Sequence, residues 1–175
     1  MRLFIAIELD DETKNMLHTA AETLRENSLR GNFTHTENYH LTLVFLGEQD
    51  NAAQVRRAMQ SVRCTPFQLH IHGSGAFRRT GGDIYWAGVE QNDTLAQLYA
   101  DLVASLRRNG LRCEDRAYKP HLTLGREVVV KHESLQAIRQ ISPDSTVKVE
   151  TITLMRSDRI NGKLTYTPIY RQKLK

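Results

Sequence analysis

Hydrophobic and polar residues alternate along several short segments of the chain, and this period of two predicts β-strands. Asn161 and Gly162 separate the last two of these segments, and this dipeptide favours a tight hairpin turn. The last two segments are therefore predicted to pair as a β-hairpin. The predicted strands span residues 2–9, 40–46, 67–73, 83–90, 121–126, 147–156 and 163–171.

Apolar residues recur every three or four positions in two longer segments, residues 11–26 and 92–109, which predicts two amphipathic helices. The second helix should end near Gly110, because Arg107 and Arg108 place positive charge in its last turn. Shorter helices are predicted at residues 51–62 and 131–140. The stripe of the second helix consists of Leu95, Leu98, Tyr99, Leu102, Val103 and Leu106.

The tetrapeptide His-Leu-Thr-Leu occurs twice, at residues 40–43 and 121–124, and the copies lie 81 residues apart in a chain of 175. Strands and helices also follow one another in a similar order before and after the middle of the chain. We therefore expect one bilobal domain over residues 1–175 with two pseudo-symmetric halves. Equivalent strands would then face each other across a cleft.

Each tetrapeptide presents one imidazole and one hydroxyl on the same side, because side chains two positions apart in a strand share a face. His40 is thus paired with Thr42, and His121 with Thr123. Displacement at phosphorus needs a base on the incoming oxygen and an acid on the leaving oxygen, and histidine suits both roles near pH 7. Threonine hydroxyls can donate to the non-bridging oxygens. One copy alone is more often an ordinary strand, but two copies at equivalent positions point to phosphoryl chemistry at a cyclic diester.

The two copies and their surroundings resemble the two-histidine (2H) phosphoesterase superfamily. Within it the chain looks like the bacterial and archaeal RNA 2′,3′-cyclic phosphodiesterases, also called 2′-5′ RNA ligases. The likeness spans nearly the whole chain. It implies an α+β fold with two antiparallel sheets around a central cleft and helices on the outside. The matching segments are residues 2–7 (RLFIAI), 38–47 (NYHLTLVFLG), 86–89 (WAGV) and 120–126 (PHLTLGR).

The resemblance also implies a reaction, the hydrolysis of RNA 2′,3′-cyclic phosphate ends to 2′-phosphates without a metal or other cofactor. The substrates would be RNA ends, tRNA fragments among them, or cyclic nucleotides. In that family the first histidine is the proton donor and the second the acceptor, which carries over to His40 and His121. The near-identity of the two motifs leaves these roles open from the residues themselves. Ligation is the same chemistry reversed, with an RNA 5′-hydroxyl in place of water.

Two further residues are candidates for substrate binding. Arg126 can clamp a phosphate if Gly125 bends the strand, because strict alternation from His121 places it on the opposite face. Phe4 can stack a base or belong to the core.

One position departs from the family pattern. Relatives often carry an arginine before the segment that leads to the tryptophan, where this chain has Asp83. Arg78 and Arg79 on the preceding loop can supply a cation or remain solvated, and the sequence leaves both alternatives open.

A competing pair of histidines, His70 and His72, also shares a strand face and matches the spacing of a metal site. Gln68 rather than an acid precedes them on that face, so exposed strand histidines are favoured and no metal is expected. A metallohydrolase built on this pair would lose activity in chelator. A non-catalytic RNA-end binder, the main alternative to the enzyme, would bind in a salt-dependent way without forming product.

Composition sets the remaining limits. Hydrophobic residues make up 40% of the chain and charged residues 25%, as in soluble globular proteins. The apolar run at residues 3–7 is too short for a membrane span, and Cys64 and Cys113 are expected to be free thiols in a cytoplasmic protein. A net charge of +4 suits a polyanionic partner such as RNA without proving one. No obligate protein partner is evident.

Overall fold

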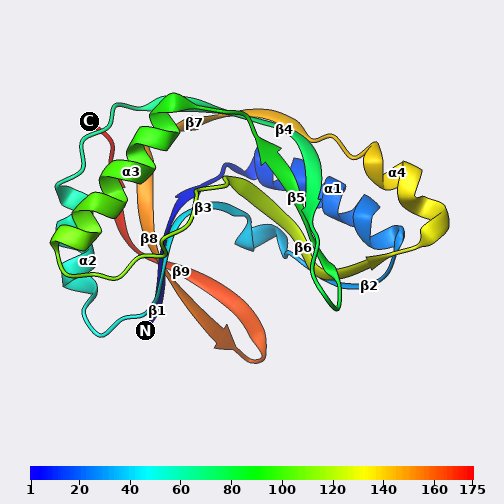
Figure 1. Cartoon of the computed structure of the whole chain (residues 1–175), viewed down its shortest axis with the longest axis horizontal. Coiled ribbons are helices and arrows are strands. Elements are labelled where there is room, and N and C mark those ends of the chain that lie inside the picture. Colours follow the sequence, from blue (N-terminus) through cyan, green and yellow to red (C-terminus); the bar gives the residue numbers. More distant parts are fainter.

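The computed structural model describes residues 1–175, and its strands form two antiparallel sheets (Figure 1). Sheet A has the strand order β3-β1-β8-β9, and sheet B has the order β2-β6-β5-β4-β7. The expected α+β class with two antiparallel sheets is confirmed. The strands are β1 (Arg2–Glu8), β2 (Ser28–Phe33), β3 (His40–Glu48), β4 (Phe67–Phe77), β5 (Asp83–Val89), β6 (His121–Val130), β7 (Asp144–Val149), β8 (Thr151–Ile160) and β9 (Lys163–Lys173).

Two long helices form where the apolar stripes predict them, and each begins at a polar cap. The side chain of Asp10 accepts a hydrogen bond from the backbone N–H of Thr13 at 2.7 Å, and Asn92 accepts one from Leu95 at 2.9 Å. The first helix packs on sheet B and the second on β3 of sheet A. The helices are α1 (Asp11–Glu26), α2 (Ala52–Gln60), α3 (Asp93–Arg108) and the short α4 (Leu135–Arg139), with single 3₁₀ turns at Thr36–Asn38 and His132–Ser134.

A single cluster of 36 buried apolar residues includes side chains from both sheets and from α1, α2 and α3. The four leucines of the two motifs all belong to it, and each is at most 3% exposed. They hold the motif strands in place, because truncating a buried leucine to alanine typically costs about 2–5 kcal/mol of stability. The opposite face of sheet A carries a smaller cluster of Phe4, Ala6 and Met155, with Phe45 and Tyr166 packed against it.

Neither sheet is a simple half of the chain, because β8 and β9 return to complete sheet A beside β1 and β3. The strand order β3-β1-β8-β9 nevertheless parallels β6-β5-β4-β7, with β2 added at the edge of sheet B. In both, a strand is followed by a long helix and then by a motif strand that pairs with the first strand. We propose on this basis that the two lobes arose from one duplicated unit within a single domain.

The strand prediction for residues 147–156 is wrong in one respect, because this segment contains parts of two strands in different sheets. β7 ends at Val149 and β8 starts at Thr151, so Glu150 is the crossing point. The buried positions change phase there, from Val147 and Val149 to Ile152 and Leu154. β2 was not predicted, because its sequence is largely polar and it forms as an edge strand by pairing with β6.

The hairpin of β8 and β9 turns at Asn161 and Gly162, which both have positive φ angles, of 51° and 77°. This is the turn that the dipeptide predicts, and the hairpin extends away from the body of the molecule (Figure 1). Cys64 and Cys113 are both free, as expected. None of the helices has both the length and the apolar character that crossing a membrane requires.

Candidate active site

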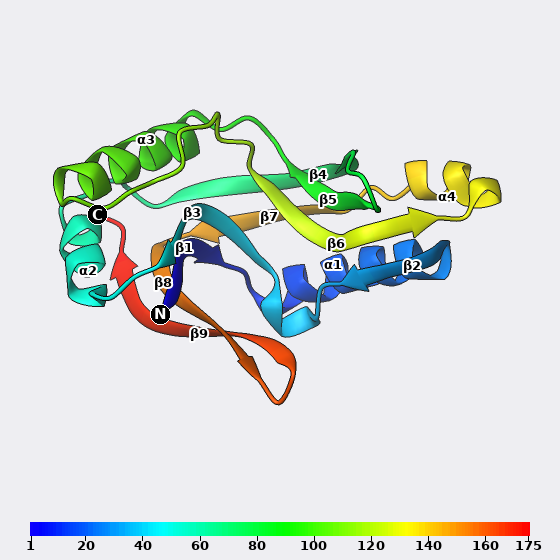
Figure 2. The ribbon, with the colours of Figure 1, turned by 60° about the horizontal axis from the view of Figure 1, so that its bottom comes forward.

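The two motif strands, β3 and β6, belong to different sheets but lie next to each other in the middle of the molecule (Figures 1 and 2). Tyr118 lies just before β6, and its hydroxyl donates a hydrogen bond to the backbone carbonyl oxygen of Thr42 at 2.9 Å. Its ring stacks on Tyr99 of α3, with centroids 4.3 Å apart. The chain leading into the second motif is therefore attached to the strand of the first.

Both motif histidines have the same kind of backbone partner. Nδ1 of His40 lies 2.7 Å from the carbonyl oxygen of Asn38, and Nδ1 of His121 lies 2.7 Å from that of Lys119. Because a carbonyl oxygen only accepts, Nδ1 carries the hydrogen in each ring. Nε2 is then the nitrogen of each neutral ring that can accept a proton from a substrate or solvent. Each carbonyl belongs to the residue two positions before its histidine. The two motifs therefore share the same histidine tautomer as well as the same sequence.

An aromatic ring meets each histidine edge-on. Tyr166 of β9 lies 5.1 Å from His40 between ring centroids, and Phe77 of β4 lies 5.0 Å from His121, both at an interplanar angle of 88°. Such contacts restrict the orientation of each imidazole. Neither aromatic residue could be predicted from the sequence pattern. Each comes from a strand distant in sequence, and alternation gives no sign of which strand delivers a neighbour.

The hydroxyl of Thr42 lies 2.9 Å from Nε2 of His40, so the imidazole and hydroxyl of the first motif are in direct contact. In the second motif, the backbone carbonyl of Thr123 accepts a hydrogen bond from the Thr34 hydroxyl at 2.8 Å. Thr123 also pairs with Trp86 across β6 and β5. The structure thus brings the hydroxyl of the first motif against its histidine, and in the second motif it fixes the backbone of Thr123.

Burial lowers the pKa of both histidines. For His40 it lowers the pKa from 6.5 to about 4, while the Asn38 carbonyl acts in the opposite direction and the charge of Arg126 adds to the lowering. The pKa of His121 is lowered for the same first reason, against a raising effect of the Lys119 carbonyl. Both rings are therefore mostly neutral at pH 7.

Arg126 lies on the same face of β6 as His121, which strict alternation did not predict. Tyr85 pairs with Gly125 but the next residue, Trp86, pairs with Thr123, so β6 contains an extra residue at this point. Leu124 and Gly125 are consecutively buried and Arg126 is exposed. This bulge satisfies the condition that the strand must bend, and the charge of Arg126 reaches both histidines.

β3 has the same bulge. Ile5 pairs with Val44, whereas the next residue of β1, Ala6, pairs with Thr42. Phe45 therefore takes the position in β3 that Arg126 takes in β6. The guanidinium of Arg2 lies over the Phe45 ring, 5.0 Å from its centroid, and thus provides a cation on this side. Nothing in the sequence pattern distinguishes Arg2 from an ordinary exposed residue at the start of a strand.

Phe4 has no free ring face for a base, because only 3% of the residue is exposed. Its ring lies 4.9 Å from that of His40 and 5.0 Å from that of Tyr166. The suggestion that Phe4 stacks a base is therefore corrected: it packs beneath the first histidine instead.

Asp83 holds the loop that precedes it. Its carboxylate accepts hydrogen bonds from the side chain of Arg78 at 2.5 Å and from the backbone N–H of Arg79 at 2.9 Å. Arg79 also lies over the ring of Phe77, 5.9 Å from its centroid. Arg78 is therefore paired within its own loop, whereas Arg79 approaches the aromatic partner of the second histidine.

A cavity of about 190 Å³ lies beside His40. Lys14 provides a positive charge in its wall, while Glu8 is held by Arg171 and Thr153 through hydrogen bonds of 2.7–3.0 Å. The wall residues are Glu8, Lys14, Glu37, Asn38, Tyr39, His40, Met155, Tyr166 and Pro168. The first histidine thus has a partly polar space next to it.

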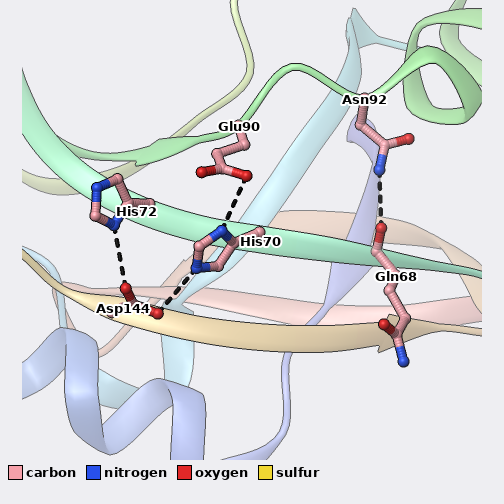
Figure 3. A network of polar contacts seen from close by, with 6 residues as sticks. All are labelled: Gln68, His70, His72, Glu90, Asn92 and Asp144. Atoms are coloured by element: carbon pink, nitrogen blue, oxygen red, sulfur yellow. Dashed lines mark hydrogen bonds and ion pairs between the residues drawn. The ribbon is translucent and has the colours of Figure 1, made fainter.

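A second group of ionisable side chains consists of His70, His72, Glu90 and Asp144 (Figure 3). Asp144 of β7 contacts both rings, with its two oxygens 2.9 and 3.1 Å from them, and Glu90 lies 2.9 Å from His70. The histidines are exposed strand residues, as expected, but two carboxylates accompany them. Alternation along β4 gives no sign of these acids, because Asp144 begins β7 and Glu90 directly follows β5.

The chain is similar in sequence and in fold to proteins of one known family. A model of the 2′-5′ RNA ligase superfamily matches residues 13–161. An RNA 2′,3′-cyclic phosphodiesterase from Archaeoglobus fulgidus is 30% identical over 154 residues, covering 86% of each chain. One from Thermotoga maritima is 35% identical over 131 residues, or 72% of this chain and 70% of that one. The crystal structure of Escherichia coli LigT complexed with 3′-AMP has a TM-score of 0.81 and 28% identity, covering 99% of this chain and 97% of that one.

Proposed function

This chain belongs to the 2′-5′ RNA ligase superfamily, and from that premise we propose that it hydrolyses 2′,3′-cyclic phosphate ends of RNA to 2′-phosphates. The observation that carries the proposal is the paired arrangement of the motif histidines. His40 and His121 begin neighbouring strands, and each is held by a backbone carbonyl that directs its Nδ1 hydrogen away from the reaction. Two relatives with the matching activity in their names support the substrate class.

The proposed reaction uses one histidine on each side of phosphorus. Nε2 of His121 takes a proton from water as the water oxygen attacks phosphorus. The bond from phosphorus to the 3′ oxygen breaks, and that oxygen receives a proton from Nε2 of His40. The products are a 2′-phosphate and a 3′-hydroxyl. The assignment of donor and acceptor follows the family, since the surroundings of the two rings are so alike.

His40 must be protonated to act as donor, although burial lowers the pKa of the free ring to about 4. A cyclic phosphodiester carries one negative charge, and an anion placed against Nε2 favours the charged imidazolium. Substrate binding would therefore supply both the phosphate and the conditions for protonating the donor. Thr42 is within hydrogen-bonding distance of the same nitrogen and can move its hydrogen bond to the phosphate.

Phosphate binding is assigned to Thr42 and Thr123, which can each donate a hydroxyl hydrogen to a non-bridging oxygen. Arg126 is proposed as a clamp, and the register shift in β6, which changes the alternation between His121 and Arg126, supports this role. The cavity beside His40 provides room for part of the nucleotide, with Lys14 available to an anionic group.

RNA is the proposed partner, in the form of ends, tRNA fragments among them, or of cyclic nucleotides. The same site would also run in reverse, with an RNA 5′-hydroxyl replacing water and forming a 2′-5′ bond. None of these steps requires a metal ion, and we expect the reaction to take place in the cytoplasm.

The test is to incubate the protein with an RNA oligomer that ends in a 2′,3′-cyclic phosphate and to identify the product by phosphorus NMR. A 2′-phosphate supports the proposal, and the reaction should continue in excess EDTA. A 3′-phosphate contradicts the assignment of the leaving oxygen. Salt-dependent binding without any product would favour a non-catalytic RNA-end binder instead.

A further inference from the structure

We propose that His70, His72 and Asp144 form a binding site for a divalent transition-metal ion, separate from the proposed active site. Two imidazoles and one carboxylate are ligands that Zn²⁺ and its neighbours in the first transition row accept. Glu90 would orient His70 from behind (Figure 3). This proposal does not depend on the proposed phosphodiesterase activity.

The ligand atoms are already gathered. One carboxylate oxygen of Asp144 lies 2.9 Å from Nε2 of His70, and the other lies 3.1 Å from Nδ1 of His72. One ligand atom from each of the three residues lies within 4.8 Å of the other two. Ligands bound to zinc at about 2.0–2.2 Å are roughly 3–4 Å apart, so small side-chain rotations suffice.

The position of Glu90 is an independent indication. Its carboxylate lies 2.9 Å from Nδ1 of His70, while Nε2 of the same ring faces Asp144. When the Nδ1 hydrogen of His70 is donated to Glu90, the lone pair of Nε2 points toward Asp144. This lone pair and the Asp144 carboxylate can then bind the same metal ion. A carboxylate behind a histidine ligand is the usual arrangement at metal sites, where it fixes the tautomer.

The strands hold the three ligands in place. His70 and His72 project from the same face of β4, and Leu69 and Ile71 between and beside them are each 1% exposed in the core. His72 pairs directly with Asp144 across β4 and β7. The two rings are stacked, with centroids 5.5 Å apart. Ligands fixed by strand pairing lose little freedom when a metal binds.

The site lies at the edge of sheet B, where β7 is the last strand. A bound ion would join β7 to β4 and would stabilise the folded chain, because the unfolded chain does not hold the ligands together. β5 lies between the strands of His72 and His121: its Gly88 pairs with His121, and a Cβ at Gly88 would lie only 2.5 Å from the backbone carbonyl oxygen of His72. Two strand spacings separate the strands of His72 and His121, or about 10 Å.

The experiment is to treat the full-length protein with EDTA, remove the chelator, and titrate it with Zn²⁺ alone by isothermal calorimetry. In a separate measurement, Tm is determined with and without Zn²⁺. We expect one binding site per chain and an increase in Tm. H72A and D144N should abolish this binding, and E90Q should weaken it by about 10–100-fold. H132A removes an exposed histidine outside the cluster and should bind like the unmodified protein.

The side chains of His72 and Asp144 are 53% and 61% exposed, so both variants should fold, and circular dichroism checks this. No saturable binding by the unmodified protein would overturn the proposal. So would binding that persists unchanged in both H72A and D144N.

Discussion

The hydroxyl of Tyr118 donates a hydrogen bond to the backbone carbonyl oxygen of Thr42 at 2.9 Å and thereby connects the two motif strands. It is a contact between segments 76 residues apart in the chain. The Thr42 hydroxyl in turn lies within hydrogen-bonding distance of His40. The bond from Tyr118 therefore helps to position the first motif relative to the second.

Replacing Tyr118 with phenylalanine should therefore affect both stability and activity. The loss of one hydrogen bond is expected to lower the free energy of unfolding by about 1 kcal/mol, as measured with urea. Turnover of a 2′,3′-cyclic nucleotide should fall by about three- to tenfold, because small misplacements of catalytic groups slow a reaction. Y170F is the control, since its hydroxyl bonds only side chains, those of Gln60 and Gln172. Unchanged turnover in Y118F would show that the bond does not position the motifs.

The stability of the folded protein should depend on pH through His40. Its folded pKa is about 4, below the unfolded value near 6.5, so the unfolded chain binds more protons between these values. The contribution of the neutral, buried His40 ring to the free energy of unfolding is fully present above pH 6.5. It is lost as the pH falls toward 4. At about 1.4 kcal/mol per pKa unit it amounts to about 3 kcal/mol.

The variant H40Q isolates this contribution, because glutamine does not titrate. Urea unfolding of both proteins from pH 4 to 8 measures the difference. The pH dependence between 4 and 6.5 should be shallower in H40Q. Parallel curves would mean that His40 is not buried as a neutral ring.

The rate should have its own pH dependence. The proposed roles require a neutral His121 as base and a protonated His40 as acid in the free enzyme, and burial lowers both pKa values. The charged groups that act on His40 are Arg126, Lys14 and His121. The profile of kcat/KM should therefore be bell-shaped with its maximum below pH 6.5.

The profile of kcat should have its maximum at higher pH than that of kcat/KM, because the bound phosphate favours the charged form of His40. Steady-state kinetics with a cyclic nucleotide from pH 4 to 9 measure both. A maximum of kcat/KM at pH 8 or above would be inconsistent with two buried histidines acting in these roles.

The proposed phosphate ligands should contribute less to turnover than the two motif histidines. Substituting Thr42, Thr123 or Arg126 with alanine removes one hydrogen bond to a charged group, worth about 1.5–3 kcal/mol, so kcat/KM should fall by about 10- to 150-fold. R126K should recover only part of this, since lysine lacks the planar fork of guanidinium. R139A, at an exposed position on α4, is the control and should retain full activity. If R126A has the same kcat/KM as R139A, Arg126 does not bind the phosphate.

Much of the fold could be predicted because it depends on local patterns. The apolar stripes of α1 and α3, the turn at Asn161 and Gly162, and the shared face of His40 and Thr42 all follow from periodicity. β2 could not be found in this way. Its polar residues are ordered by pairing with β6 and not by a pattern of their own.

The parts of the site that escaped prediction depend on long-range pairing. The direction of Arg126 is set by an extra residue in β6, visible only as a register shift against β5. Tyr166 and Phe77 meet the histidines from other strands, and Asp144 meets His70 only because β7 pairs with β4. Alternation within one strand carries no information about these neighbours.

The most direct test of the two-histidine account compares H40A and H121A with the unmodified protein in the turnover of a 2′,3′-cyclic RNA end. Circular dichroism and urea unfolding verify that the variants fold, and EDTA is present throughout. The account predicts that each variant loses about 10²- to 10⁴-fold in turnover while remaining folded. Near-native turnover by both folded variants would contradict it.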